Sequence, residues 1–314
     1  MIPLDIAPEV AAALGQGRPV VALESTLISH GLPYPQNAEV AAASEAAVRD
    51  AGSIPATVAI RDGRFLVGLD GVALEALATA APGTVRKAAR PSLAAALAAG
   101  GWAATTVSAT MIAAHAAGIR VFATGGIGGV HRGAFGPGGH PNDAGATLDV
   151  SSDLEELART PMAVVCAGPK AILDVPATLE YLETRGVPVL AVGQEDLPGF
   201  YARSSGLRAP EWVQDVEAAA RVVSAHLGLS LGGAVLVTVP VPADAALPQA
   251  LVWEVVERAI REAAEARVAG PALTPWLLAR VAELTGGAAV RANTALIVND
   301  AAVAGDLARR LARA

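Results

Sequence analysis

Short apolar runs alternate with longer amphipathic segments along most of the chain. The runs at residues 19–23, 56–60, 119–123, 163–166, 187–192 and 233–239 are almost continuously hydrophobic and of strand length, which predicts buried strands. Helices are predicted at 37–50, 104–117, 152–159, 176–185, 211–227, 248–268 and 274–284, with a last helix ending in LARRLARA. This alternation is typical of an α/β layered fold.

The predicted elements follow one another without a visible boundary. No internal repeat and no linker of low complexity divides the sequence, so we expect a single domain over residues 1–314. The one obvious loop is GAFGPGGHPNDAG at 133–145, whose glycines, prolines and Asn-Asp pair oppose regular structure. We therefore expect a mobile loop near the middle of the chain.

A long uncharged stretch at 91–119 raises the question of a membrane span. The stretch exceeds the roughly 20 residues that cross a bilayer. However, Ala, Gly, Thr and Ser dominate it, and Gly100-Gly101 interrupts it, so its gain on transfer to lipid is small. A buried turn and helix is the expected structure.

Composition and charge narrow the class of protein. The chain is 53% hydrophobic, 17% charged and 4% aromatic, which suits a globular protein and excludes disorder, collagen and disulfide scaffolds. Its net charge of −7 leaves no basic field to hold nucleic acid or an anionic membrane. The single cysteine, Cys166, cannot form an internal disulfide, and the start MIPLDIAPEV lacks a secretory signal. We expect a cytoplasmic protein.

The basic residues contain an unusual imbalance. Of the 23 Lys and Arg residues, only Lys87 and Lys170 are lysines. Coding bias explains the many arginines, and two lysines can persist by accident. Yet a lysine can lose its proton when it is desolvated or placed near another cation, and can then act as a nucleophile or base. Both lysines are therefore candidates for chemistry.

Two segments place polar or basic groups beside predicted strands. In VALESTLISHGLPYPQN (21–37), Glu24 ends a strand, and Ser25, Thr26, Ser29 and His30 follow it. Ligands bind at such strand ends, but an ordinary strand end with Asn37 as helix N-cap is equally consistent. In TVRKAARP (84–91), three cations form either a solvated basic turn or an anion pocket.

Two further segments follow buried runs and begin helices. IRVFATGGIGGVHRG (119–133) is a glycine-rich turn that fits neither a P-loop nor a dinucleotide fingerprint. In TLDVSSDLEELARTP (147–161), Ser152 and Glu155 have capping-box spacing. That helix start suits a phosphate, while Asp149 and Asp153 are either acids that favour the helix dipole or ligands of Mg²⁺ or Mn²⁺.

Lys170 stands out in the last segment, MAVVCAGPKAILDVPATLEYLETRG (162–186). It lies at the carboxyl end of a predicted strand, between the turn Gly168-Pro169 and apolar neighbours. Desolvation there favours the neutral amine, which makes Lys170 the better nucleophile candidate of the two lysines. Cys166 lies inside the apolar run and is expected to be a buried, inert thiol.

Several long strings, in chain order, resemble one family. ALESTLISHGLPYPQN, TTVSATMIAAHAAGIRVFATGGIGGVHRG, TLDVSSDLEELARTPMAVVCAGPKAILDVPATLEYLETRGVPV and FYARSSG are similar to pseudouridine-5′-phosphate glycosidases, also called the indigoidine synthase A-like family. The resemblance implies a three-layer α/β/α sandwich with a mixed, largely parallel central sheet, commonly a homotrimer. It also implies reversible cleavage of the C–C bond of pseudouridine 5′-phosphate to uracil and ribose 5-phosphate through a lysine imine, with Mn²⁺ or another divalent cation such as Mg²⁺.

The resemblance assigns roles to individual residues. It implies that Lys170 of CAGPK is the nucleophile, Glu24 of ALEST the proton donor, and Asp149 of TLDVSSD the metal ligand. The substrate-binding positions it implies are Lys87, Val107, His131, Ser151, Ser152, Asp153 and Asn293. Two departures stand out, since Ser152 replaces a smaller residue and the loop at 133–145 is longer than usual.

Two other functions compete with this expectation. Another Schiff-base lyase acting on a sugar phosphate shares Lys170 but releases no uracil. A non-catalytic phosphosugar-binding protein binds ribose 5-phosphate without turnover, and such a protein has no need of a nucleophile. The sequence does not distinguish a role in nucleoside salvage from a role in pigment formation.

Overall fold

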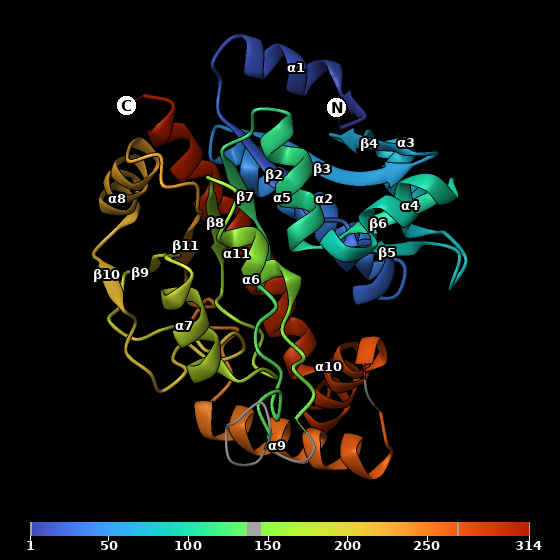
Figure 1. The fold of residues 1–314 in the computed structure, drawn as a ribbon, viewed down its shortest axis with the longest axis vertical. Coiled ribbons are helices and arrows are strands. Elements are labelled where there is room, and N and C mark those ends of the chain that lie inside the picture. The colour runs from blue at the N-terminus through green and yellow to red at the C-terminus, as the bar shows by residue number, and fades with distance from the viewer. Residues whose placement is uncertain (1, 137–145, 269, 314) are drawn as a thin grey trace.

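The computed structural model describes residues 2–136, 146–268 and 270–313 (Figure 1). Of the loop predicted at 133–145, the segment 137–145 lies outside the described residues. The described part, residues 133–136, continues a turn that follows His131.

One sheet runs through the molecule. Within the described residues it has 11 strands in the order β1-β4-β3-β2-β7-β8-β11-β9-β10, with β6 joined to β3 and β5 joined to β6. The strands are β1 (Leu4–Ile6), β2 (Val20–Leu23), β3 (Ile54–Arg61), β4 (Arg64–Val67), β5 (Arg86–Ala88), β6 (Trp102–Thr105), β7 (Val121–Ala123), β8 (Ala163–Cys166), β9 (Val189–Val192), β10 (Glu211–Val213) and β11 (Val235–Thr238).

Most neighbouring strands run parallel. Among the described pairs, only β3 with β4 and β3 with β6 are antiparallel. Helices cover both faces of the central strands (Figure 1). The expected α/β fold, with a mixed and largely parallel sheet flanked by helices, is confirmed.

Alternate residues of the central strands point to opposite faces, and each set has its own helices. Val20, Ala22 and Phe122 belong to the core on one face. The helices that contribute to this core are α1 (Pro8–Gly15), α4 (Leu93–Ala99), α5 (Val107–Ala116), α6 (Ser152–Leu157) and α7 (Val175–Thr184). Because strands with both faces covered must be apolar throughout, these strands read as continuous hydrophobic runs.

The opposite face carries the C-terminal helix. Val21, Leu23 and Val165 pack there against α2 (Gln36–Asp50), α8 (Val216–Gly228) and α11 (Ala288–Leu311). Beside them, α3 (Gly71–Ala78) packs with a π-helical turn at Leu27–Gly31. Short 3₁₀ turns at Arg90–Ser92 and Gly270–Ala272 precede α4 and α10 (Leu273–Leu284).

A lobe of helices extends from one end of the sheet. Helices α9 (Gln249–Glu265) and α10 form it, and α11 runs from this lobe along the sheet (Figure 1). Val252, Val256, Leu277 and Leu296 share one buried cluster. That cluster also contains Phe200 and Tyr201 of the FYARSSG segment, which fixes the lobe to the loops that follow the strands.

Two helix predictions began too early in the chain. Residues 102–105 form β6 before α5 begins, and residues 211–213 form β10 before α8 begins. The two short strands are held by pairing with β3 and β9, and this pairing overrides the local helical pattern.

The uncharged stretch at 91–119 contains α4, β6 and α5. None of the helices in the described ranges is long and apolar enough to span a membrane.

Candidate functional site

Three neighbouring parallel strands end together at one edge of the sheet. Glu24 follows β2, Thr124 follows β7, and Lys170 follows β8 after the turn Gly168-Pro169. Because β7 pairs with both β2 and β8, the three polar side chains are brought to one place. Strand ends of this kind are the usual ligand sites of α/β sheets.

Glu24 is a half-buried carboxyl at the base of this site. It accepts a hydrogen bond from the Thr124 hydroxyl. Removal from water raises the pKa of Glu24, while the Lys170 ammonium and then the Thr124 hydrogen bond act in the opposite direction. A carboxyl with a raised pKa stays protonated closer to neutral pH, which is the form a proton donor needs.

Lys170 is held by the glycine-rich turn that follows β7. Its Nζ donates a hydrogen bond to the carbonyl of Gly126. A Cβ on Gly126 would lie 2.5 Å from a ring carbon of Phe200 and 3.0 Å from the carbonyl oxygen of Gly168. The glycine therefore lets the two turns pack closely enough to support the lysine.

Lys87 reaches the same site from β5. Partial removal from water lowers the pKa of Lys87, and the charge of Lys170 lowers it further, while Glu24 and Asp153 oppose the shift. The two lysines of the chain therefore converge, although they are 83 positions apart in the sequence. Arg90, the neighbour of Lys87 in the basic segment, instead pairs with the buried carboxylate of Glu156.

The starts of α5 and α6 lie side by side and share one carboxylate. Asp153 accepts from the backbone N–H of Ser108 at 3.0 Å and from the N–H of Gly128 at 2.9 Å. Ser152 lies 3.3 Å from the hydroxyl of Ser108. Val107 is the first residue of α5, and an N–H at that position has no acceptor within its own helix.

The cap of α6 differs from the predicted capping box. Ser151, and not Ser152, is the N-cap, because its hydroxyl accepts from the N–H of Asp153 at 3.2 Å. The side chain of Glu155 turns away to Tyr181 and Arg185. The predicted start at Ser152 or Asp153 is confirmed by the helix range, but the capping pair is wrong.

Asn37 is likewise not a helix cap. Helix α2 begins at Gln36, and the Asn37 side chain donates to the carbonyls of Ile28 at 2.6 Å and Ala78 at 2.9 Å. The amide therefore joins the π-helical turn, α2 and α3. That bridge fixes the turn Leu27–Gly31, which begins three residues after Glu24.

His131 and Asp149 face each other across the glycine-rich turn. The His131 N–H donates to the Asp149 carbonyl at 2.9 Å, and the imidazole Nδ1 lies 3.9 Å from a carboxylate oxygen. Burial lowers the pKa of His131, the Asp149 carboxylate opposes this, and the charges of Lys170 and Lys87 add to the decrease. His131 and Asp149 therefore adjoin the two lysines.

The donor atoms around Asp149 fit one kind of metal ion. In the described ranges, no cluster of three or more His, Cys, Asp or Glu side chains has the arrangement of a metal site. The Asp149 side chain is 38% exposed. One accessible carboxylate fits a hydrated hard cation such as Mn²⁺ or Mg²⁺, which keeps several water ligands, and does not fit zinc.

Asn293 lies on α11, one turn before Ile297. A Cβ on Gly125 would lie 2.7 Å from Ile297, so this part of α11 packs directly on the glycine-rich turn.

Sequence reasoning missed Thr124 and Asp300 near this site. Thr124 gave one signal, as the first polar residue after a buried run, whereas Asp300 is an acid on a helix and gave none.

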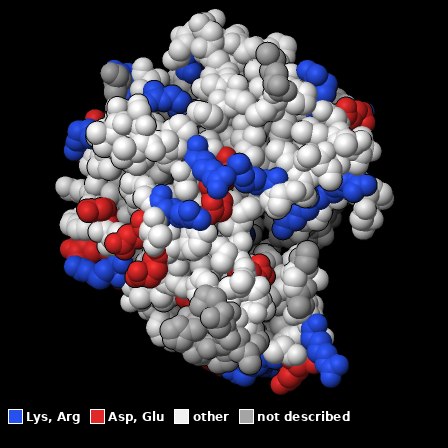
Figure 2. All heavy atoms as spheres, viewed as in Figure 1, with Lys and Arg blue, Asp and Glu red and all other residues white. Residues whose placement is uncertain are grey.

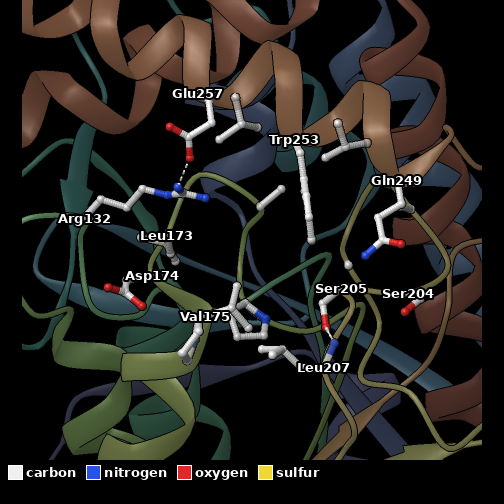
Figure 3. A pocket seen from close by; sticks show the side chains of 17 residues that line it. Arg132, Leu173, Asp174, Val175, Ser204, Ser205, Leu207, Gln249, Trp253 and Glu257 are labelled. Carbon is white, nitrogen blue, oxygen red and sulfur yellow. Dashed lines mark hydrogen bonds and ion pairs between the residues drawn. The ribbon is translucent and has the colours of Figure 1, made fainter.

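A cavity lies beside this site and does not contain it. It has a volume of about 440 Å³ and is lined by Pro169 and Ala171, the neighbours of Lys170, and by Trp253 of α9. Figure 3 shows the paired Arg132 and Glu257 on one side and Gln249 with Ser204 and Ser205 on the other. None of the predicted site residues lines this cavity.

Basic side chains gather on the face that carries α5 and α6. Figure 2 shows them there and along the edge of a hollow between the sheet and the lobe of α9 and α10, among acidic side chains. Around α6, Arg90 pairs with Glu156, and Arg159 and Arg185 pair with Glu155, so these charges largely neutralise one another.

Comparisons with known proteins identify the family of this chain. The profile of the family "Indigoidine synthase A like protein" matches residues 9–310. A "Pseudouridine-5'-phosphate glycosidase" of Paracoccus denitrificans is 52% identical over 309 residues, 98% of each chain. Another, of Deinococcus radiodurans, is 50% identical over 310 residues, covering 99% of this chain and 95% of the relative.

Solved structures resemble the whole chain. The prealnumycin C-glycosynthase AlnA, solved with ribulose 5-phosphate, has a TM-score of 0.88 and 37% identity, covering 99% of this chain and 97% of AlnA. An indigoidine synthase A-like protein of Thermotoga maritima has a TM-score of 0.86 and 31% identity, with the same coverage. With a family match over almost its full length, the chain belongs to the indigoidine synthase A-like family.

Proposed function

We propose that this protein is a pseudouridine-5′-phosphate glycosidase in which Lys170 is the nucleophile and Glu24 the proton donor. The activity follows from glycosidases that are about half identical over nearly the whole chain. The observation that carries the residue roles is the convergence of Lys170, Lys87 and a protonatable Glu24 at the ends of β2 and β8.

The substrate's C–C bond explains why a lysine is needed. Carbon is a poor leaving group, so hydrolysis between two carboxylates through an oxocarbenium ion is difficult. The neutral amine of Lys170 attacks C1′ of the ribose as the sugar ring opens, and uracil leaves after its ring carbon C5 is protonated. Water then adds to the imine carbon, and the amine departs to release ribose 5-phosphate.

Glu24 moves protons during these steps. Its raised pKa supports a protonated carboxyl when the substrate binds, so it can donate a proton to the ribose oxygen or to the base. After donation the carboxylate can take a proton from the attacking water. Lys87 supplies positive charge near the sugar or its phosphate.

The paired helix starts form the proposed binding region for the rest of the substrate. Val107, Ser151 and Ser152 offer N–H and hydroxyl donors at the start of α5 and α6, where an anion is favoured. Both carboxylate oxygens of Asp153 accept hydrogen bonds from backbone N–H groups. We therefore propose that Asp153 acts in substrate binding by holding the starts of α5 and α6 in place. His131 and Asn293 complete the proposed substrate contacts.

A divalent cation is part of the proposal. Asp149 would hold hydrated Mn²⁺, or another ion such as Mg²⁺, with His131 beside it. The cation supplies positive charge that draws the substrate phosphate toward the site. We further propose that the protein is a homotrimer in the cytoplasm and that its substrates are small molecules. The net charge of −7 supports the absence of nucleic acid among its partners.

One assay tests the activity. Purified protein is mixed with pseudouridine 5′-phosphate and Mn²⁺, and uracil and ribose 5-phosphate are followed by mass spectrometry, with EDTA as the control. We expect uracil to form, and its formation to stop with EDTA. If no uracil forms with any divalent cation, borohydride trapping with ribose 5-phosphate separates another Schiff-base lyase, which is labelled, from a phosphosugar-binding protein, which is not.

A further inference from the structure

A second, much smaller cavity lies behind Glu24. Its volume is about 10 Å³, close to the space that one water molecule needs. Four oxygen-bearing side chains line it, those of Glu24, Ser44, Thr57 and Thr124. The rest of the lining is apolar and consists of Leu23, Leu27, Ala41, Ala123 and Ile297. A buried water needs two to four polar partners, and this cavity offers them.

The hydrogen bonds of the hydroxyls leave acceptor positions free for that water. Ser44 donates its proton to the Val40 carbonyl at 2.8 Å, and Thr124 donates to Glu24. Thr57 donates to a carboxylate oxygen of Glu45 at 2.5 Å. Each hydroxyl oxygen still has a lone pair, so a water between them can donate to one of these hydroxyls while it accepts from protonated Glu24.

Glu45 connects this cluster to the surface. Thr57 is 2% exposed and lies in the sheet, where it is the partner of Leu23 in β2. Glu45 is half-buried on α2. Burial raises the pKa of Glu45, the Thr57 hydrogen bond and then Arg49 act in the opposite direction, and Glu9 of α1 adds to the increase. Glu45 is therefore a carboxylate that can hold a proton and still reach solvent.

We propose that one buried water, Thr57 and Glu45 form a proton relay that joins Glu24 to solvent on the side away from the substrate. The relay deepens the proposed function and rests on it, because it serves the proton transfers of Glu24. Thr57 and Glu45 are positioning residues in this sense, since they act through Glu24 and do not contact the substrate.

The transfer balances without any further reactant. Protonated Glu24 gives its proton to the water, the water gives one of its own to the Thr57 oxygen, and Thr57 passes its hydroxyl proton to the Glu45 carboxylate. Water and Thr57 each gain one proton and lose one, so Glu24 becomes a carboxylate and Glu45 becomes protonated. Glu45 then releases its proton to solvent, and the reverse sequence protonates Glu24 again.

The groups that face Glu24 from other elements explain why a rear path is useful. Lys170 and Lys87 lie on the substrate side, and Asp153 lies at the start of α6. A bound sugar phosphate would cover this side and hinder exchange with bulk water. The hydrogen bond from Thr57 to Glu45 instead joins β3 to α2, and none of the proposed substrate contacts takes part in it.

A crystal structure tests the water independently of activity. At a resolution that defines ordered waters, we expect one water within hydrogen-bond distance of both Glu24 and Thr57 in the wild-type protein. We expect no such water in Thr57→Val, which has the same shape without the hydroxyl. A wild-type cavity without this water overturns the relay even if the enzyme is active, whereas an inactive enzyme with the water contradicts the proposed function alone.

Kinetics test the transfer itself. We expect Thr57→Val and Glu45→Gln to lower kcat about tenfold with KM changed less than about twofold, because a proton transfer becomes limiting. The solvent deuterium isotope effect on kcat should rise, and small buffer acids such as imidazole should restore part of the rate. A purely structural role for Thr57 predicts neither the larger isotope effect nor the recovery of rate with buffer acids.

Two control variants complete the test. Thr57→Ser keeps the hydroxyl and should retain kcat within about twofold. Glu39→Gln removes an exposed carboxylate from the same helix and should leave kcat, isotope effect and buffer dependence as in the wild type. The relay is wrong if Thr57→Ser loses as much rate as Thr57→Val, or if folded Glu45→Gln keeps the wild-type rate at low buffer concentration.

Discussion

Lys170 has a property that no arginine shares, because its amine can lose a proton and form an imine with a sugar aldehyde. Replacing it with arginine keeps a long basic side chain near Gly126 but removes the nucleophile. We expect Lys170→Arg to lower kcat by at least about a thousandfold while the melting temperature stays close to the wild-type value. Borohydride with ribose 5-phosphate should label the wild type at residue 170 and should not label the variant. Full turnover by Lys170→Ala would exclude the covalent mechanism.

Thr124 offers a test of the protonation state of Glu24. Its hydrogen bond stabilises the charged carboxylate and so lowers the pKa of Glu24 from the high value that burial would set. Thr124→Val removes that bond, so the pKa of Glu24 should rise further. Since the proton donor is lost as the pH rises through this pKa, the alkaline limb of kcat/KM should move to higher pH. Thr124→Ser is the control and should keep the wild-type profile; a shift toward lower pH in Thr124→Val would contradict the assigned role.

At the scale of single residues, the chemistry was easier to predict than the contacts. Glu24 stood out because it directly follows a buried apolar run, and Lys170 because it is one of two lysines and follows another such run after the turn Gly168-Pro169. The Thr57–Glu45 bond gave no such signal, since it joins β3 to α2 and depends on how a helix packs on the sheet. Asn37 was assigned to a local cap, yet its amide satisfies two carbonyls that only the folded chain brings near.

At the scale of elements, Asp153 holds the start of α5 against the glycine-rich turn. Both of its carboxylate oxygens accept from backbone N–H groups, one at Ser108 and one at Gly128. In Asp153→Asn, an amide NH₂ would face one of these N–H groups, so one bond is lost and two donors oppose each other. We expect a loss of about 1–3 kcal/mol in the free energy of unfolding, measured with urea, and a higher KM.

A matched variant separates this effect from ordinary helix capping. Asp215 caps α8, where its side chain accepts from the single N–H of Ala218 at 2.8 Å. Asparagine caps helices about as well as aspartate, so Asp215→Asn should be nearly neutral and should leave KM unchanged. Equal stability losses in the two variants would mean that Asp153 is only a cap.

The strands in the centre of the sheet were predicted well, and those toward its edges were not. The runs that became β2, β3, β7, β8, β9 and β11 are apolar throughout because helices cover both faces of these strands. By contrast, β1, β4, β5, β6 and β10 lie outside this central block of the sheet. Such strands are set by pairing with a neighbour, which the local sequence does not reveal. Lys87 lies on one of them, so its place in the site could not be derived from its own segment.

At the scale of the whole molecule, the sheet order is what assembles the site. Strands β2, β7 and β8 are separated by about a hundred and then forty positions in the sequence, yet they are neighbours in the sheet. No periodicity in the sequence gives that order. The resemblance to a family implied a largely parallel sheet but not the order of its strands, and the structural similarity to AlnA over 99% of this chain supports the arrangement found here.

The stability of the whole molecule should depend on Asp300, an acid in the core of α11. Its side chain is 0% exposed, and neither carboxylate oxygen has a hydrogen-bond partner among the described residues. Burial raises the pKa of Asp300 well above its usual 3.8, and the smaller opposing effect of the nearby Ala167 backbone N–H does not cancel this increase. Between 3.8 and the raised pKa, the folded state therefore holds a proton that the unfolded state has lost. By linkage, the contribution of Asp300 to the free energy of unfolding is most favourable below pH 3.8, where the carboxyl is protonated in both states. It decreases as the pH rises toward the pKa of the folded state.

Asp300→Asn removes this penalty with almost no change in shape, because the amide carries no charge at any of these pH values. Urea unfolding at pH 8 should therefore give a variant that is about 1–3 kcal/mol more stable than the wild type, and the difference should shrink as the pH approaches 4. Asp306, on the same helix, is the control: Arg310 and Arg309 outweigh partial burial and lower its pKa, so Asp306→Asn should destabilise the protein at pH 8. If Asp300→Asn is instead less stable at pH 8 than at pH 5 relative to the wild type, Asp300 is charged in the folded state and has a partner that neutralises it.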